Sequence, residues 1–200
     1  MTARERGKSF IIIVGLLVGL GVISFIRHTN VAGGAVPPAD ATLEAAFAPD
    51  AGAEELVVKV IGTATKTIKM SAYTFTSPAI VRALIAAKKR GVHIQLVADE
   101  RANLAEDQSG KGRHALNAVS DAGVEVRMIS AYAIHHDKAL VVDGRHIQTG
   151  SFNYTNSAAT RNSENVLVVW NNPALAAIYL RHWTSRWSQG RDYNSSYTNS

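Results

Sequence analysis

The sequence predicts an α/β fold in which a mixed β-sheet is sandwiched between helices. Strand-like and helix-like apolar patterns alternate between residues 43 and 193. Two of the helical patterns open with a polar residue followed by proline, and an Asp-Gly dipeptide joins two short apolar segments as a hairpin. The chain has 200 residues, 46% hydrophobic and 18% charged, which suffices for one compact domain.

The first half of this domain begins with a helix and a strand. Residues 53–63 carry apolar side chains at helical spacing, and residues 67–75 alternate as a strand does. Ser77 and Pro78 then provide the N-cap and first position of a helix. That helix ends at the basic residues Lys88–Arg90 and a glycine, which favours the negative end of the helix dipole.

The second half continues the alternation. Asn172 and Pro173 open a last helix, and Asp143-Gly144 is a strong hairpin turn. The remaining predicted elements are a strand at 92–98, a helix at 113–122, a strand at 124–129, hairpin strands at 139–142 and 146–149, and a strand at 164–170.

The N-terminal region has the layout of an export signal. Basic residues within Arg4–Lys8 precede an uncharged apolar run, Phe10–Ile26. Gly33 and Ala35 are small residues at a plausible cleavage spacing, yet the run also reaches the lower length limit of a membrane span. Residues 1–28 are therefore either a cleaved signal peptide or a retained membrane anchor. Either implies an exported protein, in a bacterial periplasm or on the outer face of the inner membrane.

The rest of the chain divides by composition. Residues 29–42, rich in Gly, Pro and Ala, are expected to form a linker. Residues 43–193 form the predicted domain, and the polar residues 194–200 are expected to be a flexible tail.

Charge and cysteine content exclude some classes of protein. The formal charge is +5, but outside residues 1–35 the chain carries 17 basic and 15 acidic side chains, a net charge of only +2. Net charge alone is therefore a weak argument for a nucleic-acid partner. The chain has no cysteine, which excludes disulfides, a thiol nucleophile and a cysteine-based zinc site.

One stretch gathers groups that can act on a phosphate. His136 and Lys138 are two residues apart, so on a strand they share a face. After the turn at Asp143 the chain returns antiparallel, which brings Ser151 and Asn153 back beside them.

This set suits an anionic phosphodiester. Lys138 and the Asn153 amide can donate to the non-bridging oxygens, and His136 can act as nucleophile or as general acid and base. No cluster of acidic or histidine residues at metal-ligand spacing accompanies them in the sequence. We therefore expect no metal and no cofactor, because side chains supply the positive charge.

The pattern H-x-K-x4-D-x6-G-S-x-N, from His136 to Asn153, resembles the signature of the phospholipase D superfamily. The chain is most similar in layout to the small bacterial endonucleases of that superfamily, which carry a single motif. Further similar segments are Ala72–Phe75, Asp99–Arg101, Asn162–Asn165 and the pair Trp183 and Trp187.

The resemblance implies a role for each motif residue. His136 matches the nucleophile that forms a phosphohistidine, and Lys138 and Asn153 match the phosphate ligands. Ser151 matches the hydroxyl of the active site and a substrate contact. The other two matching residues are Glu164, the carboxylate that hydrogen-bonds the imidazole, and Asp143, the motif aspartate, which is more structural than catalytic.

The resemblance also implies a homodimer. A site of this family needs two motifs, whereas this chain has one, so two copies would share one site at a two-fold axis. The implied activity is metal-independent, sequence-nonspecific cleavage of DNA, with RNA as an open alternative. Arg101, Lys111 and Arg113, in a loop beyond a strand end, are further candidates for substrate contacts.

Two other functions stay open. A lipid phosphodiesterase of the same superfamily would suit the anchor-like N-terminus. A non-catalytic nucleic-acid-binding module of a conjugation or export system would bind with a steep salt dependence and yield no product.

Overall fold

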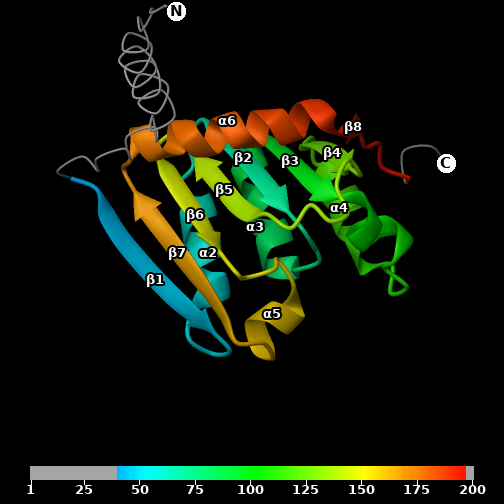
Figure 1. The fold of residues 1–200 in the computed structure, drawn as a ribbon, viewed down its shortest axis with the longest axis horizontal. Coiled ribbons are helices and arrows are strands. Elements are labelled where there is room, and N and C mark those ends of the chain that lie inside the picture. The colour runs from blue at the N-terminus through cyan, green and yellow to red at the C-terminus, as the bar shows by residue number, and fades with distance from the viewer. Residues whose placement is uncertain (1–39, 197–200) are drawn as a thin grey trace, which may run out of the picture. The chain divides into compact units, whose positions relative to one another are not determined.

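A computed structural model describes residues 40–196 (Figure 1). It contains one mixed β-sheet and helices on both of its faces, which confirms the predicted fold class. The strands are β1 (Thr42–Ala48), β2 (Thr67–Ala72), β3 (His93–Asp99), β4 (Glu125–Ile129), β5 (Lys138–Val142), β6 (His146–Gly150), β7 (Glu164–Trp170) and β8 (Arg191–Asp192). The helices are α2 (Ala53–Gly62), α3 (Pro78–Lys89), α4 (Lys111–Asp121), α5 (Asn156–Thr160) and α6 (Pro173–Gln189), with one π-helical turn, η2 (Arg101–Ala105).

The eight strands lie in the order β1-β7-β6-β5-β2-β3-β4-β8. Strands β2, β3 and β4 are parallel, and every other neighbouring pair is antiparallel. As a result, several strand ends meet at one edge of the sheet (Figure 1). They are the carboxyl ends of β2 and β3, the start of β5, the end of β6 and the start of β7. Ligand sites in open α/β sheets commonly lie at such an edge.

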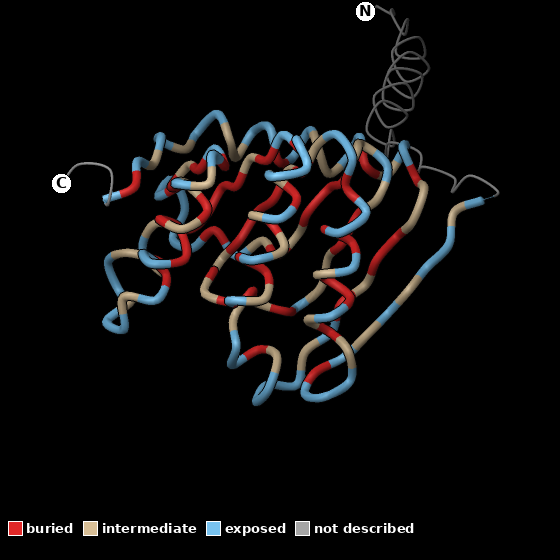
Figure 2. Tube along the Cα trace, turned by 180° about the vertical axis from the view of Figure 1, so that it is seen from behind, coloured by how far each residue is buried: buried red, intermediate tan, exposed pale blue. Residues whose placement is uncertain are grey.

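Two apolar layers hold the helices to the sheet. Helices α2, α3 and α4 cover one face over the larger core, in which Ile61, Leu84 and Leu116 are fully buried. Helix α6 crosses the other face, where Trp183 packs on Val97 and donates its indole N–H to the Met70 carbonyl at 2.9 Å. Figure 2 shows the buried segments concentrated in the central strands.

The predicted helix starts are confirmed. The Ser77 hydroxyl accepts the Ile80 N–H at 3.2 Å, and the Asn172 side chain accepts the Leu175 N–H at 3.0 Å. Each cap satisfies a backbone donor that the first helical turn leaves unpaired, and each is followed by proline. These local signals explain why both boundaries were predictable.

Asp143 ties the β5–β6 turn to the loop before β2. Its backbone adopts a left-handed φ of 51°, as the hairpin turn requires. Its carboxylate accepts hydrogen bonds from the N–H groups of Thr65, Lys66 and Thr67 and from the Thr65 hydroxyl, at 2.7–2.9 Å. Partial burial alone raises the pKa of the Asp143 carboxyl, but these hydrogen bonds outweigh it and lower the pKa to about 2.

Replacing Asp143 by alanine is expected to lower the free energy of unfolding by about 2 kcal/mol, because it leaves these donors without their acceptor. The pKa of this carboxyl is lowered on folding, so its stabilisation is present at neutral pH and lost as the pH falls from about 4 towards about 2. Urea unfolding of both proteins at pH 7 and at pH 3 measures this. Asp121→Ala, at an exposed position at the end of α4, is the control. Equal losses for the two variants at pH 7 would contradict the role of Asp143.

The structure adds elements that the sequence did not predict: β1, η2, α5 and β8. Strand β1 begins at Thr42, inside the expected linker 29–42, and Asp40 already accepts a hydrogen bond from Asn171. Within the expected flexible tail 194–200, Ser195 is buried and the Ser196 hydroxyl accepts a hydrogen bond from the Asn117 amide at 2.8 Å.

The expectations for residues 1–28, for most of the linker and for the last four residues lie outside the described residues. Within 40–196, no helix has both the length and the apolar composition needed to cross a bilayer.

Candidate active site

The motif residues gather at the sheet edge described above. Lys138 is the first residue of β5 and lies beside Ala72 of β2, and His136 is in the loop just before it. The pairing of Ala139 with Thr149 puts the end of β6, and hence Gly150, next to Lys138. The hairpin thus brings the two halves of the motif together, as predicted.

Tyr73 supports both His136 and Lys138. Its ring makes an edge-on contact with the His136 imidazole, with the ring centroids 4.7 Å apart. The Lys138 ammonium lies 5.1 Å from the centroid of the same ring and donates a 2.8 Å hydrogen bond to the His136 carbonyl. His136 itself is exposed, so its imidazole is accessible from solvent.

Lys138 is a buried cation. Its side chain is only 6% exposed, and this burial lowers the pKa of its ammonium to about 8, although the carboxylates of Glu164 and Asp137 oppose the shift. A cation that lies among so few compensating groups gains from an anionic ligand, because the ligand restores the interactions that water no longer supplies.

Asp99, at the end of β3, anchors the loop that carries His136. This buried carboxylate accepts the His135 N–H at 2.7 Å and the Ala102 N–H at 2.8 Å. Because the first bond is made by the residue next to His136, Asp99 restrains the backbone that presents the imidazole.

Asn103 restrains the backbone of the loop after β2. Its buried amide accepts the Phe75 N–H at 2.8 Å and donates to the carbonyls of Tyr73 and Asp99 at 2.6 and 2.7 Å. The loop that carries Tyr73 is therefore tied to the loop that carries the Asp99 carboxylate.

Ser151 and Glu164 form a hydrogen-bonded pair at the edge of the site. The Ser151 hydroxyl donates to the Glu164 carboxylate at 2.5 Å and accepts the Asn165 N–H at 3.0 Å. The other Glu164 oxygen accepts from the Asn162 amide at 2.9 Å. The resemblance implied a bond from Glu164 to His136, whereas the hydrogen bonds that Glu164 makes within 40–196 go to Ser151 and Asn162.

Gly150 lets the two strands approach at this point. Its φ is 151°, and a Cβ atom there would lie 2.2 Å from the Asn165 carbonyl oxygen. Glycine is thus required before Ser151 because any side chain would push β7 away.

Asp143 does not lie at the sheet edge that holds His136 and Lys138. It lies in the turn at the far end of β5, about 16 Å from Lys138 by the rise of five strand residues. Within one chain its carboxylate does not reach a phosphate held at Lys138, which corrects its place among the catalytic candidates and supports a structural role.

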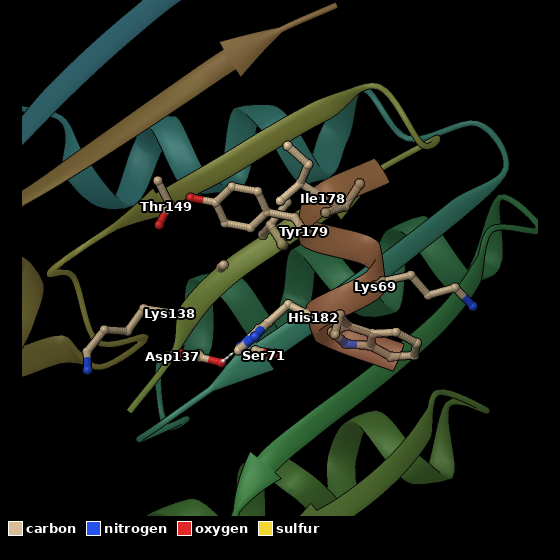
Figure 3. A pocket seen from close by; sticks show the side chains of 12 residues that line it. Lys69, Ser71, Asp137, Lys138, Thr149, Ile178, Tyr179 and His182 are labelled. Carbon is tan, nitrogen blue, oxygen red and sulfur yellow. Dashed lines mark hydrogen bonds and ion pairs between the residues drawn. The ribbon is translucent and has the colours of Figure 1, made fainter. Parts of the chain in front are cut away.

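Asp137 lies between the two motif residues but faces the opposite side of the sheet. Its carboxylate is 2.7 Å from the His182 Nε2 of α6 and lines a cavity of about 370 Å³ between α6 and the sheet. Figure 3 shows Asp137 directed toward His182, with Lys138 pointing away from that cavity. The strand alternation that places Leu140 in the larger core accounts for this division.

Asn153 opens onto a second, larger groove of about 970 Å³ on the α3 and α4 side of the sheet. Lys111, at the start of α4, and Arg161, just after α5, also line it. Of the three basic residues predicted to contact substrate, Lys111 lines this groove. The other two lie elsewhere: Arg101 pairs with Glu106 at 2.8 Å, and Arg113 is an exposed residue of α4 that does not line the groove.

Sequence reasoning did not identify Tyr73, Asp99, Asn103 or Arg161 as residues of the site. Tyr73 lies near the end of the predicted strand 67–75, and Asp99 directly follows the predicted strand 92–98. Residues at the carboxyl ends of parallel strands are a signal that could have found them. Asn103 and Arg161 carry no such signal, because the segments that fold next to them, the loop after β2 and the start of α4, are distant in the chain. Among residues 40–196, no three His, Cys, Asp or Glu side chains gather as a metal ion would need.

The comparisons with known proteins agree with this geometry. Residues 57–187 match a family model described as "Cardiolipin synthase, PLD-like domain". The chain is 36% identical over 140 residues to a phospholipase D of Rickettsia bellii, covering 70% of this chain and 66% of the relative. It is 30% identical over 127 residues to a mitochondrial cardiolipin hydrolase of Chlamydomonas reinhardtii, covering 64% and 54% of the two. The chain thus spans less than two thirds of these relatives' own length.

Among solved structures, the fold is similar to that of Nuc from Salmonella typhimurium, a phospholipase D family member. The TM-score is 0.74 and the sequences are 44% identical, over 78% of this chain and 100% of Nuc. NucT from Helicobacter pylori, with a TM-score of 0.67 and 18% identity over 77% of this chain and 100% of NucT, shares the fold. With the motif from His136 to Asn153 assembled on that fold, the chain belongs to the phospholipase D superfamily of phosphodiesterases.

Proposed function

We propose that the protein is a metal-independent, sequence-nonspecific endonuclease that hydrolyses DNA through a covalent phosphohistidine on His136. The observation that carries this proposal is the single motif on a short domain that is 44% identical to Nuc over the whole of Nuc. RNA is a second substrate of the same chemical class.

The chemistry needs one nucleophile and one acid. The His136 imidazole attacks phosphorus, forming a P–N bond, while Lys138 and the Asn153 amide neutralise the non-bridging oxygens. The P–O bond to the 5′ oxygen breaks, and that oxygen takes a proton from a second imidazole. This imidazole then removes a proton from water, whose oxygen attacks phosphorus and releases His136.

The second imidazole is the reason for proposing a homodimer. The two histidines that lie near the motif are directed elsewhere: His135 is buried, and His182 lies across the sheet with Asp137. In a homodimer, a two-fold axis brings His136 of the second copy to the same site, where its imidazole serves as the acid.

The surroundings of the site support a nucleic-acid substrate. The groove that adjoins Asn153 carries hydroxyl, amide and basic side chains among apolar ones, and the polar and basic groups can contact a sugar-phosphate backbone.

A lipid phosphodiesterase is the second candidate function. The relatives named phospholipase D and cardiolipin hydrolase favour it. So do Tyr132 and Ile134, two large apolar side chains that are 41% and 43% exposed in the loop before His136. Side chains of this kind can insert into a lipid interface.

The test is an assay of the full-length protein in EDTA on supercoiled plasmid, single-stranded DNA and RNA, beside phospholipid vesicles that contain cardiolipin. The nuclease proposal expects nicked plasmid that His136→Ala does not produce. Headgroup release without nicking would favour the lipid function. Binding of DNA without any product would instead indicate a binding module.

A further inference from the structure

The groove beyond Asn153 has two walls, and its lining mixes polar and apolar side chains. One wall comes from the segment between η2 and the first turns of α4, and the other comes from α5 and the residues around it. Hydroxyl groups line it on both sides, from Thr74 and Thr76 after β2 and from Thr155 and Ser157 at α5. Because Asn153 belongs to the groove as well as to the motif, the groove adjoins the motif at this residue.

Each wall contributes one basic residue. Lys111 and Arg161 are both exposed, and neither makes an ion pair within the described part of the chain. This distinguishes them from Arg101, whose charge Glu106 neutralises at 2.8 Å. Two exposed cations in one groove, without carboxylate partners, favour an anionic ligand.

The acidic residue of the groove is already engaged. The Asp107 carboxylate accepts the Gly112 N–H at 2.6 Å and the Ser109 hydroxyl at 2.5 Å, so it caps the start of α4. Gly112 must be glycine for this, since a Cβ atom there would lie 2.6 Å from the Asn103 carbonyl oxygen. Asp107 therefore shapes the wall that presents Lys111.

We propose that this groove binds the stretch of nucleic-acid strand adjoining the scissile phosphate, with Lys111 and Arg161 contacting its flanking backbone phosphates. The inference rests on the proposed nuclease function and extends it to a subsite within one chain. Of the described residues that line the groove, none is Tyr, Trp or Phe, and His114 is its one aromatic ring, so it offers little surface for stacking bases. The groove reads the backbone, and binding there is independent of sequence.

The experiment measures binding and cleavage separately. In a His136→Ala background of the full-length protein, the Kd for a fluorescent single-stranded DNA oligonucleotide is titrated at several salt concentrations. The double variant Lys111→Ala/Arg161→Ala is expected to raise Kd about tenfold at low salt. Removal of two phosphate contacts should also reduce the magnitude of the slope of log K against log salt by about 1.4.

Arg113→Ala is the matched control, because Arg113 is an exposed cation on the same helix as Lys111 but outside the groove. With active protein, the double variant should raise KM for DNA and leave the hydrolysis of bis(p-nitrophenyl) phosphate within about twofold of the parent, since a small diester does not reach the groove. The conservative variant Lys111→Arg/Arg161→Lys should retain the affinity.

Three results would overturn the proposal. The first is that the double variant binds DNA with the same Kd and the same salt slope as the parent, although the parent cleaves that DNA. The second is an equal loss for Arg113→Ala, and the third is an equal loss on the small diester. A parent that hydrolyses the small diester but neither binds nor cuts nucleic acid would overturn the nuclease function itself, which is a different outcome.

Discussion

His136→Ala is expected to reduce phosphodiester cleavage by about 10⁴-fold or more, because the variant has lost the nucleophile and, in the proposed dimer, also the acid. Its fold should be unaffected, since the imidazole is exposed and its ring contact is to Tyr73 alone among the described residues. Initial rates on plasmid DNA and on bis(p-nitrophenyl) phosphate measure the loss.

His93→Gln is the control for this experiment. His93 is an exposed histidine at the amino end of β3, where its Nε2 is 2.8 Å from Glu125, and it lies at the edge of the sheet opposite the motif. Its activity should stay within about twofold of the parent. Acid-quenched turnovers with labelled substrate should trap a phosphorylated protein only when His136 is present. Substantial cleavage by His136→Ala would rule out the covalent mechanism.

Lys138→Gln is expected to lower kcat by about 10²- to 10³-fold, because it removes the buried cation that faces the transferring phosphate. The same substitution weakens the hydrogen bond to the His136 carbonyl, made at 2.8 Å by the ammonium. Lys66→Gln, outside the motif, is the control and should leave kcat unchanged. A Lys138→Gln variant in which only KM rose would show that Lys138 acts in the ground state alone.

The pKa of Lys138 also predicts how kcat/KM changes at alkaline pH. Because burial lowers the pKa of its ammonium to about 8, the charged form is complete below that pH and is lost above it. The kcat/KM of the parent should therefore fall as the pH rises through about 8. In Lys138→Arg the guanidinium stays charged, so the residual activity should lack this limb. An unchanged alkaline limb in that variant would assign it to another group.

Local signals explain how much of the fold could be predicted. The N-caps Ser77 and Asn172, each followed by proline, define the starts of α3 and α6 by interactions within a few residues. The left-handed residues Asp143 and Gly144 similarly define the β5–β6 turn. Such contacts depend on neighbours in the sequence and can be read from it.

Strand β1 shows why other elements could not be predicted. It is an edge strand whose large apolar side chains, Leu43 and Phe47, lie on its exposed face at 72% and 58% exposure, so its apolar residues do not mark the buried face. Its hydrogen bonds are made to β7, whose residues follow more than a hundred positions later. Strand β8 likewise exists only through its pairing with β4.

The sequence by itself determined the motif, in which His136 and Lys138 are two residues apart, and the hairpin that closes it, because the turn residues specify the return of the chain. Only the tertiary structure decided what surrounds them. It placed the Tyr73 ring against both residues, directed Glu164 to Ser151, and assembled Lys111 and Arg161 in one groove. These contacts join segments that are far apart in the chain, and their geometry follows from strand order and helix packing, which no local pattern encodes.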